Sequence, residues 1–239
     1  MTIPSEVSAI QSLREYLRYL IESDIHDVCK VPVSTDLPGV KSKSMIPSVS
    51  SKHESLEEIE LELKGCTGCG LSECRSHIVF GGGNQRADIL FVIDGPNVEE
   101  DESGHIVQGE SGKKLEEIIE KGMNLSLAQV YICPLVKCRP SQGRALLEEE
   151  IQSCMSFFNR QLAVIAPKVI IALGGRAAQI LLNCNTPIEQ LRGIWQTYHG
   201  IPVMPTYHPA YVLKNYTVPI RKQVWNDVRE AIRYLSVHS

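Results

Sequence analysis

The chain has 239 residues, 43% of them hydrophobic, and a formal net charge of -4. This length and composition predict one main domain with an appendage, and they exclude a protein that binds nucleic acid through a uniformly basic surface. Any contact with DNA must therefore depend on basic residues that are gathered locally.

The sequence contains no secretory signal and no run approaching the roughly 18 apolar residues of a membrane span. Eight cysteines in a chain of this length are not a small disulfide scaffold. We therefore expect a protein of the reducing cytoplasm with no membrane association. In that compartment, clustered cysteines indicate metal binding or catalysis more than disulfides.

The N-terminal part differs from the rest of the chain. Apolar residues at helical spacing predict an amphipathic helix over residues 5–29, and a segment rich in Ser, Pro and Lys predicts a linker over 31–55. We expect residues 1–60 to form this helix and linker, and residues 61–239 to form the main domain. The acidic run at Glu57, Glu58, Glu60 and Glu62 predicts a solvated helix face.

From Cys66 onward, strands and helices are predicted to alternate. The predicted strands, apolar along their length, are Ile89–Asp94, Val130–Leu135, Val169–Leu173 and Val203–His208. The predicted helices are Lys113–Lys121, Leu146–Ile165, Arg176–Leu182 and about Arg221–Leu235. This order predicts an α/β fold of three layers, with a central four-stranded parallel sheet and helices on both faces.

Two strand ends carry residues capable of chemistry. Asp94 ends the first predicted strand and His208 ends the last. An Asp at a strand end is often a turn or cap residue, and a His before Pro is often only part of a turn. Ligands of open parallel sheets bind at the carboxyl ends of the strands, so the pair together favours a functional site.

Four cysteines form a candidate metal site. Cys66 and Cys69 make a C-x2-C pair among glycines, and Cys138 and Cys154 follow far downstream. Four thiolates suit either a [4Fe–4S] cluster or a structural zinc ion, and the spacing leaves both open. Among the remaining cysteines, Cys29, Cys74 and Cys184 are predicted to be small buried hydrophobes, whereas Cys133 stands at a predicted strand end.

A run of motifs from Cys66 to about Leu235 resembles the family 4, iron–sulfur uracil-DNA glycosylases. These motifs are C-T-G-C-G-L-S-E-C-R, I-V-F-G-G-G-N, V-K-C-R-P, A-L-G-G-R-A-A, L-R-G-I-W, T-Y-H-P-A-Y-V-L and V-W-N-D. The resemblance implies a uracil-DNA glycosylase-like fold and a structural [4Fe–4S] cluster on Cys66, Cys69, Cys138 and Cys154.

The resemblance also implies base excision from DNA, in which a base is flipped out of the stack and its N-glycosidic bond is cut. Asp94 then stabilises the oxocarbenium-like sugar or positions water, and His208 stabilises the anionic base. The expected partner is DNA. A nucleotide cofactor is not expected, and the family-like state is a monomer.

The predicted base pocket contains Gly95, Pro96, Asn97, Val107 and Pro134, and it departs from the family pattern. Asp94 replaces a longer Glu, Val107 replaces a Phe that stacks on uracil, and Pro134 replaces an Asn that reads its edge. Loss of the stack weakens base binding by about 1–3 kcal/mol, and an unpaired base edge by about 1–3 kcal/mol. Asn97, in place of a Gly, is expected as a left-handed turn residue or as an amide donor.

Three hypotheses follow from these departures. The first, which we favour, is a glycosylase with weak or altered base preference. The second is a weak or inactive DNA-binding paralogue that retains its cluster, and the third is a protein whose cluster is the functional element.

The predicted DNA contacts are Lys137, Arg139, Pro209, Tyr211 and Lys214. Tyr211 to Leu213 resemble the family's insertion loop, which wedges into the base stack. The alternative for this segment is a helix start in which Leu213 packs on the core.

Overall fold

A computed structural model of the chain describes residues 54–238. The helix predicted over 5–29 and nearly all of the linker over 31–55 therefore lie outside the described residues. The first described helix, α2 (Leu56–Lys64), runs without interruption across residue 60. Within the described residues, no helix is long and apolar enough to cross a membrane.

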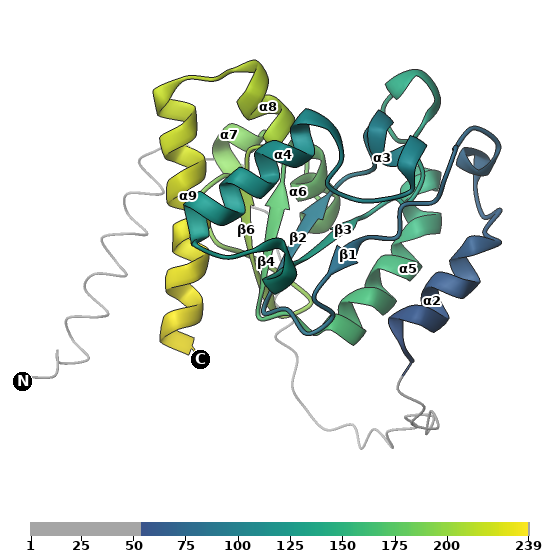
Figure 1. Cartoon of the computed structure of the whole chain (residues 1–239), viewed down its shortest axis with the longest axis horizontal. Helices are drawn as coiled ribbons and strands as arrows, with labels where there is room; N and C mark the ends of the chain where they lie inside the picture. Colours follow the sequence, from purple (N-terminus) through teal and green to yellow (C-terminus); the bar gives the residue numbers. More distant parts are fainter. Residues whose placement is uncertain (1–53, 239) are drawn as a thin grey trace, which may run out of the picture. The chain divides into compact units, whose positions relative to one another are not determined.

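A mixed sheet of six strands forms the centre of the molecule (Figure 1). In spatial order the strands are β1 (Gly82–Gly83), β3 (Tyr131–Pro134), β2 (Ile89–Ile93), β4 (Val169–Leu173), β6 (Ile201–Thr206) and β5 (Gln196–Tyr198). The four inner strands are parallel, as predicted, and both edge strands are antiparallel to their neighbours. The predicted central four-stranded parallel sheet is confirmed. The structure adds one edge strand on each side, and strands of two and three residues are too short to produce a periodic pattern.

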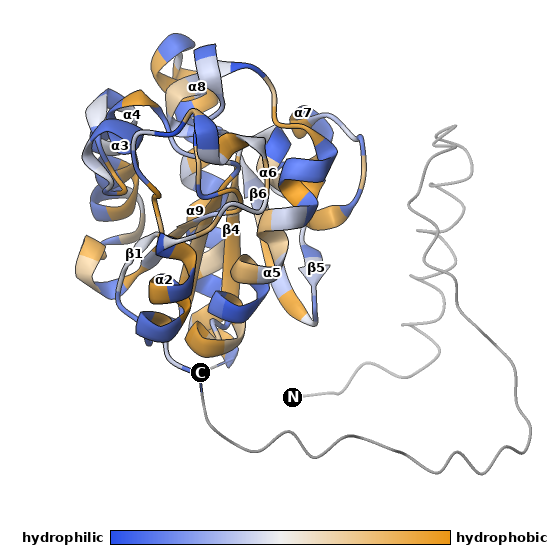
Figure 2. Ribbon diagram, turned by 90° about the vertical axis from the view of Figure 1, so that its right-hand side faces the viewer, coloured by the Kyte–Doolittle hydropathy of each residue, from blue (hydrophilic) through white to orange (hydrophobic). Residues whose placement is uncertain are grey.

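Helices cover both faces of the sheet (Figures 1 and 2). The α-helices that follow α2 are α3 (Val98–Ser103), α4 (Gly109–Glu117), α5 (Glu148–Ile165), α6 (Gly175–Leu182), α7 (Ile188–Leu191), α8 (Pro209–Lys214) and α9 (Val218–His238). A π-helical turn, η2 (Ile118–Met123), continues α4, and short 3-10 turns are η1 (Gly70–Glu73), η3 (Leu127–Gln129) and η4 (Ser141–Gly143). The predicted three-layer α/β architecture is confirmed.

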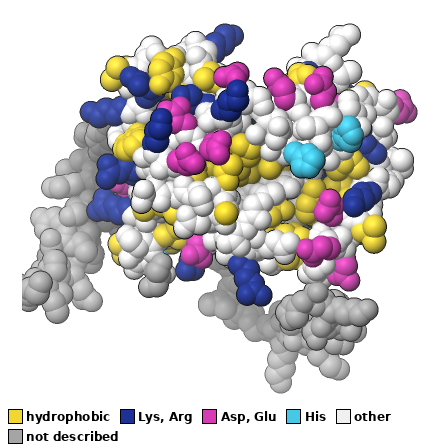
Figure 3. All heavy atoms as spheres, in the orientation of Figure 1, with side chains coloured by type: hydrophobic (Ala, Val, Ile, Leu, Met, Phe, Trp, Pro, Cys, Tyr) yellow, Lys and Arg dark blue, Asp and Glu magenta, His cyan; other side chains and the backbone are white. Residues whose placement is uncertain are grey.

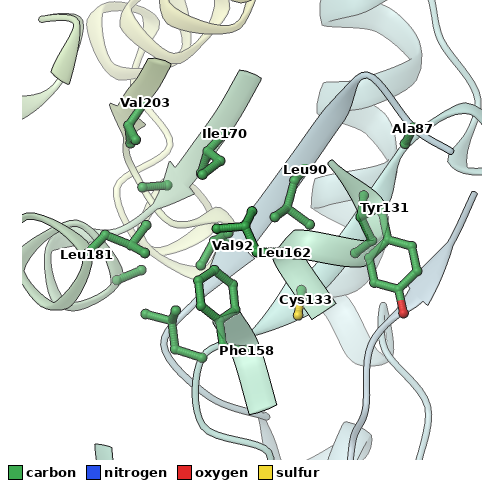
Figure 4. Packing of buried hydrophobic residues seen from close by; sticks show 14 of the residues in the cluster. Ala87, Leu90, Val92, Tyr131, Cys133, Phe158, Leu162, Ile170, Leu181 and Val203 are labelled. Atoms are coloured by element: carbon green, nitrogen blue, oxygen red, sulfur yellow. The ribbon is translucent and has the colours of Figure 1, made fainter. Parts of the chain in front are cut away.

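A hydrophobic core lies on each face of the sheet, and the alternating side chains of β2 contribute to both. Leu90 and Val92 pack with α2, α5 and α6, whereas Ile89, Phe91 and Ile93 pack with α4, η2 and α9. Figure 4 shows the first of these cores, with Leu90 and Val92 among side chains from α5 and α6. Because both faces are covered, the strand is apolar along its whole length.

Helix α2 begins at a capping box. Ser55 Oγ accepts a hydrogen bond from the Glu58 N–H at 3.2 Å, and Glu58 Oε2 accepts one from the Ser55 N–H at 2.9 Å. Leu56, Ile59 and Leu63 face the core. Glu57, Glu58 and Glu62 are exposed and Glu60 is partly so, which confirms the predicted solvated acidic face.

Candidate active site and cysteine cluster

Asp94 and His208 lie at the same edge of the sheet. They follow β2 and β6, and β4 runs between these two strands. Leu135 and Val136 donate N–H groups to the Ile93 and Asp94 carbonyls at 2.8 and 3.0 Å, which holds the Asp94 backbone. Burial lowers the pKa of His208, and the negative charge of Asp94 opposes that shift, so the two groups lie close enough for their charges to interact. The tertiary structure therefore brings the predicted catalytic pair into electrostatic contact.

The tautomer of His208 follows from one hydrogen bond. Its Nδ1 accepts the backbone N–H of Ala210 at 3.2 Å at the start of α8. An accepting Nδ1 leaves the proton of the neutral ring on Nε2. Burial lowers the pKa of His208 below its ordinary value of 6.5, and the Asp94 charge opposes that shift. The ring is therefore a neutral hydrogen-bond donor near pH 7.

Gly174 makes room for His208. It follows β4 with φ of 94°, and a Cβ atom at this position would lie 3.0 Å from the His208 Cβ. Its N–H donates to the Thr206 carbonyl at 2.8 Å. Only glycine combines this backbone conformation with so close an approach. Gly174 therefore allows the backbone of His208 to lie against the end of β4.

A buried polar network supports the strand end before His208. Thr206 Oγ1 donates to Asp227 Oδ2 at 2.6 Å, and Arg192 Nε donates to the same oxygen at 3.0 Å. Asp227 is 2% exposed, and burial raises the pKa of its carboxyl while Thr206 and Arg192 lower it. Sequence reasoning noted the L-R-G-I-W and V-W-N-D motifs without a role, and this network joins them.

A small cavity of about 30 Å³ opens beside His208. Its lining consists of Ile93, Gly95, Asn97, Glu100, Ser111, Gly112, Leu115, Ile132, His208 and Pro209. The structure thus brings Gly95 and Asn97 of the predicted base pocket next to His208. The volume suits a water molecule, so a flipped base requires neighbouring side chains to move.

The side chain of Asn97 is occupied by helix α3. Its Oδ1 accepts the Glu100 N–H at 2.8 Å, and its Nδ2 donates to the Gln108 carbonyl at 3.1 Å. Its φ is -78°, so the expected left-handed turn conformation was wrong. An N-cap needs extended backbone, which explains the difference.

Glu100 is a site residue that sequence reasoning missed. It is 5% exposed, and its carboxylate accepts the N–H groups of Asn97 at 3.0 Å and Val107 at 2.9 Å. Burial is the main cause of its raised pKa. A glutamate three residues after an Asn cap is the signal that predicts this reciprocal bond. Glu100 thereby ties α3 to the loop that carries Val107.

Val107 and Pro134 stand outside the cavity lining. Val107 has φ of 65°, which is rare for a β-branched residue, and a Cβ on Gly112 would lie 2.3 Å from its carbonyl carbon. Pro134 ends β3, and the next N–H along, that of Leu135, bonds to Ile93 on β2. The Pro134 nitrogen therefore faces the β1 side of β3. The pairing between β1 and β3 ends at Ile132, so the missing N–H of Pro134 costs no hydrogen bond between these strands.

The four candidate metal ligands meet around one small cavity. Cys66 and Cys69 come from the segment between α2 and η1, Cys138 follows β3, and Cys154 lies on α5. All four line the cavity. Within the described part of the chain, no group of three or more His, Cys, Asp or Glu side chains stands ready to hold a metal ion. The thiols thus surround a common space without converging on one point.

Hydrogen-bond donors point at these sulfurs. The N–H groups of Gly68 and Lys137 lie 3.5 and 3.3 Å from the sulfurs of Cys66 and Cys154, and Arg75 Nη1 lies 3.4 Å from the sulfur of Cys138. Burial raises the pKa of Cys138 to about 11, whereas Arg75 lowers it. Such donors stabilise sulfur that carries negative charge, as in metal-bound thiolate. The chemistry of these donors therefore suits metal-bound thiolate, although the four thiols do not converge on one point.

Lys137 was wrongly predicted as a DNA contact. It is 0% exposed, and its Nζ donates to the Pro134 carbonyl and to Cys133 Sγ, the latter at 3.1 Å. The buried carbonyl and thiol explain why the ammonium turns inward. Lys137 therefore stabilises the segment between β3 and Cys138 and does not reach a phosphate from this position.

The prediction that Cys74 is buried was wrong, and the alternative of a helix start for Tyr211 to Leu213 holds except for the packing of Leu213. Cys74 is exposed, and its thiol donates to the carbonyls of Leu71 and Arg139. In α8, Val212 is the residue that packs on the core, while Leu213 is 36% exposed. Cys184 is partly buried and Cys133 fully buried. Cys29 lies outside the described residues.

Of the other predicted DNA contacts, Pro209, Tyr211 and Lys214 lie on α8 directly after His208, and Arg139 lies after the cysteine segment. Tyr211 and Lys214 are exposed on α8, and Arg139 is partly exposed after the cysteine segment. The Tyr211 ring stacks on Tyr207 with centroids 4.8 Å apart. Pro209 is buried as the first residue of α8 and lines the cavity beside His208, so it shapes the loop more than it offers a surface.

Comparisons with known proteins agree with this architecture. The family model of the uracil DNA glycosylase superfamily matches residues 80–229. The chain is 34% identical to a type-4 uracil-DNA glycosylase of Thermotoga maritima, over 77% of this chain and 97% of that protein. Similar proteins of the same description occur in Saccharolobus solfataricus, 36% identical over 77% of this chain and 88% of that protein, and in Sulfurisphaera tokodaii, 35% identical over 77% and 86%.

Proposed function

Since the chain belongs to the uracil-DNA glycosylase superfamily, we propose that it is a DNA repair glycosylase that hydrolyses the N-glycosidic bond of uracil or another deaminated or damaged base. The observation that carries this proposal is the position of Asp94 and His208, which follow β2 and β6 at the same carboxyl edge of the sheet. A neutral donor and a carboxylate at that edge suit the two charges that develop when the bond breaks.

The roles of the two residues follow from the two charges that develop as the bond breaks. Negative charge develops on the departing base, and the Nε2–H of His208 donates a hydrogen bond to it. The positive charge develops on the sugar, and the Asp94 carboxylate stabilises it or orients the attacking water. A neutral imidazole suits this task because its Nδ1 is already held by the Ala210 N–H. The donor is therefore fixed in place before the base arrives.

We infer that Cys66, Cys69, Cys138 and Cys154 hold a [4Fe–4S] cluster. The shared cavity and the N–H groups directed at the sulfurs support this inference. When bound, such a cluster supplies a covalent tie between the segment after α2, the segment after β3 and helix α5. Glycosidic cleavage requires no electron transfer, so we assign the site a structural role.

The partner of this protein is DNA, reached through the site edge with Arg139, Tyr211 and Lys214 as candidate contacts. Phosphate contacts from such residues position the protein without reading sequence. We further propose a cytoplasmic monomer in which the glycosylase domain, predicted over residues 61–239, also includes helix α2, because Leu56, Ile59 and Leu63 pack into its core. Gel filtration of the full chain tests the monomer.

A second function is favoured by the residues of the predicted base pocket. Val107 lacks an aromatic ring, Pro134 lacks an amide, and the cavity beside His208 has a volume of only about 30 Å³. These features suit a paralogue that binds altered DNA with little or no cleavage. They also suit a glycosylase whose preferred base is not uracil.

A panel of lesion oligonucleotides separates these functions. The cluster-loaded protein is incubated with DNA bearing uracil, hypoxanthine, xanthine or an oxidised base, and abasic sites are measured. We expect cleavage of at least one lesion, reduced about 10²–10³-fold in His208→Ala by loss of one donor. His199→Ala, an exposed histidine in the β5–β6 turn, serves as the matched control. Binding without cleavage of any lesion would establish the second function.

A further inference from the structure

A groove runs beside the candidate active site, between helix α9 on one side and α4 with η2 on the other. Its first part is lined by Lys114, Glu117, Ile118, Lys121, Gly122, Val212, Tyr216, Arg221, Val224, Trp225 and Val228. An adjoining hollow shares Lys121, Gly122 and Trp225 and continues past Arg229 and Arg233. We define these two hollows together as the α4–α9 groove.

The close approach of the two walls depends on Gly122. A Cβ atom at this position would lie 3.1 Å from the Val228 side chain and 3.8 Å from the Trp225 ring. The π-helical turn η2 carries this glycine, and its neighbours Ile119 and Met123 are buried. Ile118, Val224 and Val228 line the groove beside Gly122, so this part of the groove is apolar.

The rim of the groove is basic. Along α9, Arg221, Trp225, Arg229 and Arg233 follow at intervals of four residues, so they lie in one row along the helix. Lys121 faces them from η2 and is 68% exposed. Two carboxylates are present, and both are paired: Glu117 with Lys114 and Lys121, and Glu230 with Arg233. In a chain of net charge -4 this local excess of cations stands out, and Figure 3 shows Lys and Arg side chains gathered at this edge of the molecule.

Two aromatic rings stand open among these cations. Tyr216 is 53% exposed, with Lys114 and Arg221 at 4.8 and 4.7 Å from its ring centroid. Trp225 is 41% exposed at the junction of the two hollows. Exposed rings between phosphate-binding cations form the pattern that binds single-stranded nucleic acid by base stacking.

The groove is continuous with the proposed DNA-binding edge. Val212 lines it from α8, the helix that follows its N-cap residue His208 and carries Tyr211 and Lys214. From Arg221 to Arg233 the helix rises about 18 Å at 1.5 Å per residue. This length corresponds to about five nucleotides of one strand at 3.4 Å each. A strand that leaves the active site over α8 thus meets a groove of matching length and charge.

We propose that the α4–α9 groove binds the DNA strand that flanks the excised nucleotide. Lys121, Arg221, Arg229 and Arg233 contact its phosphates, and Trp225 or Tyr216 stacks on one of its bases. The proposal rests on DNA being the substrate and adds a second contact region outside the base pocket.

The test measures how binding depends on strand length. Lesion-bearing oligonucleotides are extended one nucleotide at a time, on the 5′ side in one series and the 3′ side in the other. For the wild-type full chain, the dissociation constant should fall over about five added nucleotides on one side only. Trp225→Ala should weaken binding of the long form about tenfold, the effect of losing one base stack, and leave the short form unchanged. Trp225→Phe should recover part of the loss, which separates stacking from folding defects.

Charge reversal provides the second arm. The Arg229→Glu/Arg233→Glu double variant should abolish the length dependence of binding. The association constant should also fall less steeply with salt, with a log–log slope that is smaller in magnitude by about 2. The control is Arg86→Glu/Lys168→Glu, which makes the same charge change at two exposed positions before β2 and β4. Equal length dependence in the wild type and the groove variants would overturn the proposal, as would an equal effect of the control.

The cleavage rate at saturating short substrate keeps this test distinct from that of the proposed function. Unchanged cleavage by the groove variants, together with lost length dependence, supports the proposal. If the wild type cuts no lesion yet binds DNA with the one-sided length dependence, glycosylase activity is rejected and the groove still stands.

Discussion

Arg192 and Asp227 form an ion pair next to the strand end that leads to His208, with the carboxylate buried and the guanidinium partly buried. The guanidinium Nε lies 3.0 Å from Asp227 Oδ2, and Thr206, two residues before His208, donates to the same oxygen. Arg192 also lies over the ring of Tyr207, 5.9 Å from its centroid. Helix α9 is thus connected by polar bonds to the segment that carries the imidazole.

Removal of Asp227 should therefore destabilise the fold. Asp227→Ala leaves Arg192 and Thr206 without their acceptor in a buried site, and we expect a loss of about 3–5 kcal/mol in the free energy of unfolding. Urea denaturation measures this loss. The Arg192→Ala/Asp227→Ala double variant should lose less than the sum of the two single variants, because the pair is coupled. Strict additivity would contradict the network.

The imidazole of His208 should titrate below its ordinary pKa of 6.5. Burial lowers this pKa and the Asp94 charge raises it, so Asp94→Asn should lower it further. Between the pKa of the folded protein and 6.5, His208 binds more protons in the unfolded chain than in the folded one. The free energy of unfolding should therefore decrease as the pH falls through this range. NMR titration of the ring, assigned with His208→Gln, measures the midpoint. A midpoint above 6.5, or an upward shift in Asp94→Asn, would contradict the assignment.

Loss of one cluster ligand should remove the cluster. Purified without oxygen, the wild type should contain about four irons per chain and absorb visible light. Cys138→Ala should lose both properties and melt at a lower temperature, because the tie between β3 and α5 is gone. Cys74→Ala is the matched control, since this exposed thiol lies outside the cavity lining. Stoichiometric zinc in place of iron would refute the cluster.

Restoring the two missing groups should improve uracil excision. Val107→Phe returns a stacking ring and Pro134→Asn returns an amide, each worth about 1–3 kcal/mol of base binding, or roughly 5- to 150-fold. The measurement is cleavage of uracil DNA relative to the wild type. Val107→Gly is the control, because it relieves the left-handed backbone at φ of 65° without adding a ring. An equal gain in Val107→Gly would attribute the effect to the backbone.

The sequence alone determined the framework. Four apolar runs predicted the inner strands of the sheet, because a strand buried on both faces needs apolar residues along its whole length. The strand-end rule then placed Asp94 and His208 at one edge without any coordinates. Cys66, Cys69 and Cys138 stand in motifs that are local in the chain, and the family resemblance added Cys154 to them.

Only the tertiary structure decided which polar groups are buried and with whom. Lys137 carries the positive charge expected of a DNA contact, yet in the folded chain its Nζ donates hydrogen bonds to Cys133 and Pro134. The Arg192–Asp227 pair joins residues 35 positions apart, and the α4–α9 groove exists because Gly122 lets two distant segments approach. The hydrophobic periodicity of a segment indicates which of its faces is buried. Which side chains of two distant segments meet depends instead on how the helices pack on the sheet. That physical difference separates the predicted framework from the site around His208.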